Sequence, residues 1–98
     1  MRTMLKFLLP VEKSNAAIKD GAIARTLEPI MTKLKPEAAY FTSFDRKRGG
    51  LIFFDLADPS QIPEVVEPLF LDLDAAVELT PVMNADDLRK GLGKVAQK

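Results

Sequence analysis

Five polar side chains each interrupt an otherwise apolar stretch of this sequence, which makes them the first candidates for chemistry. They are Lys6, Tyr40, Thr42, Asp55 and Glu78. A carboxylate or an amine that is half-buried among apolar neighbours has a shifted pKa and can serve as an acid or a base. Tyr40 is the only tyrosine and could donate a hydrogen bond to a ligand oxygen. The alternative is that all five lie at strand ends or sheet rims, where they form ordinary cross-strand pairs.

Two further polar groups are candidates. The basic run 46–48 is followed by Gly49 and Gly50, and such a loop could hold a phosphate or an acidic partner. Arg25, Asn84 and Asp87 would matter if they face a pocket between a sheet and its helices. The alternatives are a solvated hairpin tip for the basic run, surface charge for Arg25 and helix capping for Asn84.

Two absent residue types exclude several kinds of site. The chain has no cysteine, so it has no disulfide, thiolate nucleophile or cysteine-based metal site. It has no histidine, so a Ser-His-Asp triad is impossible and the commonest metal ligand is missing. A haem, zinc or non-haem iron site would need a less usual ligand set. We therefore expect no cofactor and no metal, and no catalytic residue can be assigned.

The composition is that of an ordinary globular chain. Its 98 residues include 14 basic and 14 acidic side chains, so the net charge is zero. A neutral chain lacks the positive patch of a nucleic-acid binder, and no apolar run is long enough to span a membrane. We expect one domain over residues 1–98, with no nucleic-acid or membrane partner. The first residues resemble a strand better than a signal peptide, which predicts a cytoplasmic protein.

A β-hairpin is predicted in the middle of the chain. Two runs rich in aromatic and β-branched residues, 38–44 and 51–56, flank a polar turn at 45–50. The second run is apolar on both faces, with Phe53 on one side and Phe54 on the other. A small antiparallel sheet usually leaves one polar face to water. We therefore expect something to cover both faces here.

The first helix is predicted to open at Ser14 or Asn15, both good capping residues. Apolar residues at three- and four-residue spacing give it one stripe as far as Leu34. Pro29 lies inside this pattern and predicts a kink or a break.

The second helix is predicted to follow Asp58, with Pro59 at its first position and Gln61 completing a capping box. Its apolar residues again repeat at helical spacing. Pro68 lies beyond the first turn, so this helix should be short or bent.

The remaining elements complete a recognisable order. Strands are predicted at 2–9 and 76–83, with Pro81 indicating a sheet edge or a bulge, and Asn84 opens a C-terminal helix. The order β-α-β-β-α-β with a final helix predicts an α+β, ferredoxin-like fold with a four-stranded antiparallel sheet. In such a sheet the first strand lies between the third and the fourth, so Lys6 could reach Asp55 or Glu78.

In element order and size the chain resembles the dimeric α+β-barrel superfamily, which includes small monooxygenases and muconolactone isomerases. In its motifs it is similar to a set of short, uncharacterised bacterial proteins. The motifs are 35–42, 58–63, 67–70 and 77–83. The resemblance implies a homodimer that packs sheet against sheet, but no activity and no superfamily catalytic residue comes with it.

Three functions follow as hypotheses. The first is a homodimer that binds a small apolar or aromatic molecule between sheet and helices. The second is a cofactor-free monooxygenase- or isomerase-like enzyme on a small organic substrate. The third is a purely structural self-association module. The candidate pocket residues are Lys6, Tyr40, Asp55, Glu78 and Arg25. An apolar cavity without converging ionisable groups would favour the first hypothesis.

Overall fold

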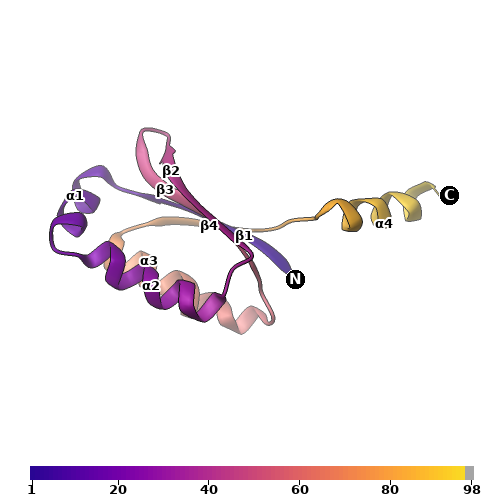
Figure 1. Cartoon of the computed structure of the whole chain (residues 1–98), viewed down its shortest axis with the longest axis horizontal. Coiled ribbons are helices and arrows are strands. Elements are labelled where there is room, and N and C mark those ends of the chain that lie inside the picture. The colour runs from indigo at the N-terminus through magenta and orange to yellow at the C-terminus, as the bar shows by residue number, and fades with distance from the viewer. Residues whose placement is uncertain (97–98) are drawn as a thin grey trace.

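The strands form one antiparallel sheet whose order is β2-β3-β1-β4 (Figure 1). They are β1 (Arg2–Leu9), β2 (Ala38–Phe44), β3 (Lys47–Asp55) and β4 (Ala76–Pro81). The computed structural model describes residues 1–96, so residues 97 and 98 of the expected domain lie outside the described residues. β1 lies between β3 and β4 and is antiparallel to both. The expected α+β class with four antiparallel strands is confirmed.

The helices fall into two groups. The first three lie on one side of the sheet, and the last one projects away from the rest of the molecule (Figure 1). They are α1 (Val11–Lys19), α2 (Ala22–Leu34), α3 (Ile62–Leu73) and α4 (Ala85–Ala96). Among residues 1–96 no helix is both long and apolar enough to cross a membrane.

The first predicted helix is in fact two helices, and its predicted start was wrong. α1 begins at Val11, directly after Pro10, and Ser14 lies buried within it. The chain breaks at Gly21, whose φ of 78° belongs to the left-handed region that glycine adopts at little cost. Pro29 lies inside α2 without ending it. The break expected at Pro29 therefore falls eight positions earlier, where glycine permits the turn.

The start of α3 follows the predicted capping chemistry. Asp58 accepts a hydrogen bond from the backbone N–H of Ser60, and the Gln61 side chain accepts one from the backbone of Asp58. These bonds close a capping box around a single 3₁₀ turn, Pro59–Gln61, before the α-helix begins. α3 then continues through Pro68 as far as Leu73, so the expected shortening at Pro68 does not occur.

The hairpin turn is tighter than the predicted six residues. Only Asp45 and Arg46 turn the chain, with φ of 48° and 64°, which is the geometry of a two-residue hairpin loop. Lys47–Gly50 already belong to β3. The turn predicted at 45–50 was wrong because polar and glycine residues within a strand resemble a loop in sequence.

The face of the sheet under α1–α3 carries the core. Residues of β1 alternate between half-buried and buried, as expected for a strand with two different faces. Leu5 and Ile52 are opposite each other on β1 and β3, and neither is exposed. The buried cluster continues into the helices through Ala17, Ile30, Val65, Leu69 and Leu73.

The other face, here called the open face, is covered by no helix among residues 1–96 (Figure 1). Its positions alternate with the core positions along each strand. Its apolar side chains are Met4, Leu8, Tyr40, Phe44, Leu51 and Phe53. The predicted apolarity of both sheet faces is therefore present in the fold.

The sheet ends close to the start of α4. β4 is an edge strand and ends at Pro81, two residues before the predicted boundary, because proline has no N–H to donate. Val82 still donates a hydrogen bond to the carbonyl of Arg2, 3.1 Å away. After Asn84 the chain enters α4, in which no residue is buried.

Candidate functional site

A largely apolar pocket lies between the sheet and the first two helices, beside the edge strand β2. This edge pocket has a volume of about 340 Å³. Six apolar side chains contribute most of its lining, namely Phe7, Leu9, Ile18, Ile23, Leu27 and Phe41. Ile18 and Phe41 are 53% and 54% exposed although both are large and apolar. Apolar side chains around a hollow are typical of sites for small apolar ligands.

Gly50 explains why two aromatic rings meet at the wall of this pocket. Phe7 and Phe41 both pair with Gly50, from β1 and β2 respectively. A Cβ at Gly50 would lie 2.7 Å from the Phe7 ring and 2.8 Å from the Phe41 ring. Without that Cβ the rings come together, with centroids 6.3 Å apart and planes tilted by 55°.

Arg48 closes one end of the edge pocket. Its guanidinium donates hydrogen bonds to Ser14 Oγ at 2.7 Å and to Asn15 Oδ1 at 2.8 Å, so it ties β3 to α1. Both partners are neutral, and no carboxylate within residues 1–96 forms an ion pair with Arg48. The predicted basic loop is thus divided. Arg48 supports the pocket, while Arg46 lies in the hairpin turn.

Three of the sequence-predicted residues lie in one row on the open face. Lys6 is opposite Glu78 on β4 and opposite Leu51 on β3, and Leu51 is in turn opposite Tyr40 on β2. The Lys6 ammonium lies 5.1 Å from the centre of the Phe44 ring, a cation–π contact. Tyr40 is 64% exposed. Lys6, Glu78 and Tyr40 therefore lie in one row on the open face, on the opposite side of the sheet from the core.

The other predicted residues lie elsewhere. Asp55 is at the far end of β3, opposite Arg2. Arg25 is on α2, where its guanidinium donates to the backbone carbonyl of Asp20 at 2.6 Å. Neither lines the edge pocket. Asn84 caps α4, since it exchanges hydrogen bonds with Asp87 at 2.8 and 3.1 Å.

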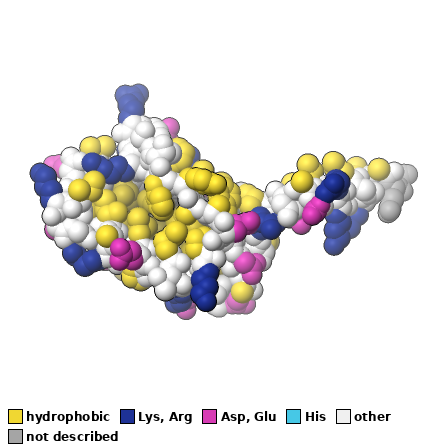
Figure 2. All heavy atoms as spheres, in the orientation of Figure 1, with side chains coloured by type: hydrophobic (Ala, Val, Ile, Leu, Met, Phe, Trp, Pro, Cys, Tyr) yellow, Lys and Arg dark blue, Asp and Glu magenta, His cyan; other side chains and the backbone are white. Residues whose placement is uncertain are grey.

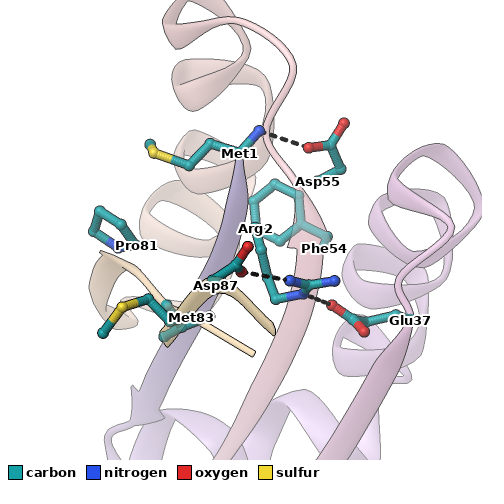
Figure 3. Close-up of a pocket in the computed structure, with 9 residues that line it drawn as sticks. Met1, Arg2, Glu37, Phe54, Asp55, Pro81, Met83 and Asp87 are labelled. Atoms are coloured by element: carbon teal, nitrogen blue, oxygen red, sulfur yellow. Dashed lines mark hydrogen bonds and ion pairs between the residues drawn. The ribbon is translucent and has the colours of Figure 1, made fainter. Parts of the chain in front are cut away.

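A wider depression of about 760 Å³ lies at the end of the sheet, around Arg2 (Figure 3). The Arg2 guanidinium donates to Glu37 Oε1 at 2.6 Å and to Asp87 Oδ2 at 3.1 Å. The hydrogen bond to Glu37 is the main cause that raises the pKa of Arg2. The amino group of Met1 pairs with Asp55 at 2.6 Å in the same region. Because these charges satisfy one another, this region serves as a junction between strands and α4.

The sequence hypothesis placed a ligand between sheet and helices but missed the apolar residues that line the edge pocket, and it missed the Arg2 junction. Gly49 and Gly50 were the available signal for the pocket, because glycine inside a strand often marks a close approach of neighbouring groups. The junction had no comparable signal. Arg2, Glu37 and Asp87 lie far apart in sequence, and their meeting depends on the strand register.

Within residues 1–96, no group of three or more Asp or Glu side chains is arranged to hold a metal ion. No protein-family model and no curated protein sequence matches the chain. A function for this chain therefore has to be inferred from its own residues.

Proposed function

We propose that this chain is a homodimer that binds a small apolar or aromatic molecule in the edge pocket without transforming it. In this proposal the chain has the ferredoxin-like arrangement of the dimeric α+β-barrel superfamily, and a second copy covers its open face. The observation that carries the ligand proposal is the apolar lining of the edge pocket.

The pocket suits binding better than catalysis. The ionisable candidates Lys6, Glu78 and Asp55 lie on the open face or at its end, and Arg25 lies on α2. An acid–base step needs a group within hydrogen-bond reach of the reacting atom. A ligand held among Phe7, Phe41 and neighbouring aliphatic side chains would instead be held by burial of apolar surface.

The open face supports the dimer. Several large apolar side chains lie together there. Lys6 and Glu78 are the two charges of the middle row, and the charges of Arg2, Lys47 and Asp55 lie at the strand ends. Contiguous apolar surface of this kind marks interaction sites in globular proteins. In a two-fold dimer each copy covers the open face of the other.

Binding is tested with naphthalene as the probe, followed by ¹H–¹⁵N NMR. We expect amide shifts that concentrate on residues lining the edge pocket. The variant Ile18→Trp should fill the pocket mouth. It should raise the naphthalene concentration that gives half of the maximum shift at least about tenfold. Leu71→Trp is the matched control, because Leu71 is 74% exposed on α3 and away from the edge pocket.

Two results would contradict the ligand proposal. One is the absence of saturable shifts with naphthalene. The other is an equal loss of binding in Ile18→Trp and Leu71→Trp. A dimer that binds no probe would leave the purely structural module as the better account. The cofactor-free enzyme stays the weaker alternative, because none of its candidate residues lines the edge pocket. These residues are Lys6, Tyr40, Asp55, Glu78 and Arg25.

A further inference from the structure

The C-terminal helix α4 has an apolar side that packs against nothing in its own chain. Leu88, Leu92 and Val95 are 45%, 55% and 59% exposed, and no residue of α4 is buried. Their spacing places all three on one side of the helix. Figure 2 shows hydrophobic side chains along one edge of α4 and most of its charged side chains elsewhere. Such a stripe on a globular chain needs a partner surface.

The N-terminal end of α4 is fixed to the sheet, and this sets the direction in which the helix points. Val82 extends the β1–β4 hydrogen bonding, Asn84 and Asp87 cap the first turn, and Arg2 donates to Asp87. From this end the helix points away from the sheet (Figure 1). Folding back onto its own open face would break these contacts. The stripe therefore has no partner surface within residues 1–96 of its own chain.

The apolar side of α4 is shaped for a flat partner. Ala85, Gly91 and Ala96 lie on the same side as the three large apolar residues, as helical spacing requires. A Cβ at Gly91 would meet nothing within 4 Å. Small residues beside the stripe allow the helix backbone to approach a sheet closely.

The open face of a second copy matches this stripe in length and in apolar character. Twelve residues make α4 about 18 Å long, and the outer strands of a four-stranded sheet are about 14–15 Å apart. Leu92 lies in the middle of the stripe and Leu51 lies in the middle row of the open face, so the two apolar centres can meet. The chain has zero net charge, so two copies do not repel each other.

We propose that α4 of each copy lies across the open face of the other, with Leu92 of one near Leu51 of the other. The stripe then covers apolar side chains that the fold leaves to water, and two equivalent arms hold the copies together. This inference rests on the proposed dimer and adds the element that holds it. Helices that dock through residues at such spacing are a recurrent mode of recognition.

The first test replaces residues on the two sides of α4 with the same residue type. Sedimentation velocity is measured for the native chain, for Leu88→Gln/Leu92→Gln and for the control Lys90→Gln, which alters the opposite side. We expect the double variant to raise the dimer dissociation constant at least about tenfold and the control to leave it unchanged. If the double variant is as dimeric as the native chain, the proposed role of α4 is wrong but the dimer stands. If the native chain is monomeric, the dimer itself is contradicted.

The second test uses the absence of native cysteine. In Leu51→Cys/Leu92→Cys a disulfide can join only introduced positions, and it forms only where the Cβ atoms come within about 4.5 Å. We expect oxidation to give a covalent dimer that peptide mapping assigns to a 51–92 linkage. A 51–92 linkage at the monomer mass would show that α4 folds back on its own sheet. That result, or linkages restricted to 51–51 and 92–92, would overturn the exchange.

Discussion

Gly49 and Leu8 are opposite each other on β3 and β1, and the glycine is there because no other residue fits. A Cβ at Gly49 would lie 2.5 Å from the backbone oxygen of Phe7 and 2.8 Å from the ring of Phe44. From the sequence, Gly49 and Gly50 were predicted to belong to a polar turn. Only the register, which a single sequence does not determine, turns them into contact points for aromatic rings.

Replacing Gly49 by alanine should destabilise the protein by about 1–3 kcal/mol, because a backbone oxygen cannot move aside as a flexible side chain can. Gly93→Ala is the control. It adds the same methyl group in open space on α4, where alanine favours helix. Urea unfolding measures both variants. Equal midpoints for Gly49→Ala and the native chain would contradict the close approach.

A second prediction at this scale concerns Asp58. Its hydrogen bonds from Ser60, the side-chain hydroxyl first and then the backbone N–H, hold the pKa of Asp58 below its ordinary value. A carboxylate with a lowered folded-state pKa stabilises the fold above the unfolded value of about 3.9 and loses that effect as the pH falls through the folded pKa. Ser60→Ala should raise the pKa of Asp58, which an NMR titration of its carboxyl carbon follows. An unchanged titration in Ser60→Ala, compared with the control Ser43→Ala, would show that the hydroxyl has no such role.

The candidate site was predictable only in part at the scale of residues. The apolar runs around Lys6 and Glu78 indicated neighbouring strands, and the two residues are indeed opposite each other. Of the five polar residues first singled out, only Thr42 lines the pocket that we favour, because its walls are mainly large apolar side chains that in sequence resemble ordinary core.

At the scale of elements, the helical pattern located the helices but misplaced the break. Pro29 was the expected point of interruption, yet α2 runs through it, and the chain turns at Gly21 instead. Periodic apolar residues on both sides of Gly21 concealed the break in sequence. The capping box at Asp58 was predictable because it depends only on residues that are adjacent in the chain.

Alanine substitutions at Gly21 and Pro29 test which of these residues marks the break between the helices. Gly21→Ala forces a side chain into the left-handed region and should cost about 1–2 kcal/mol in the free energy of unfolding. Pro29→Ala restores a backbone donor inside α2 and should not destabilise the fold. Thermal unfolding followed by circular dichroism compares them. A larger loss for Pro29→Ala than for Gly21→Ala would place the structural break at the proline after all.

At the scale of the whole molecule, the sheet has one face covered by helices and one face left open (Figure 1). The sequence predicted apolar residues on both faces, and the register now assigns them. Phe54 is 2% exposed in the core, whereas Phe53 is on the open face. The projecting α4 was predicted only as a helix, because nothing in a single chain indicates where an amphipathic stripe finds its partner.

The central claim is that two copies meet through the open face, and sedimentation velocity at micromolar concentration tests it most directly. We expect the native chain to sediment at twice its monomer mass. Phe53→Asp should sediment as a monomer with a native far-ultraviolet circular dichroism spectrum, because it places a charge on the open face without touching the core. Leu71→Asp, on the exposed side of α3, should remain a dimer. A native chain that is monomeric, or a Phe53→Asp variant that stays dimeric, would contradict the account.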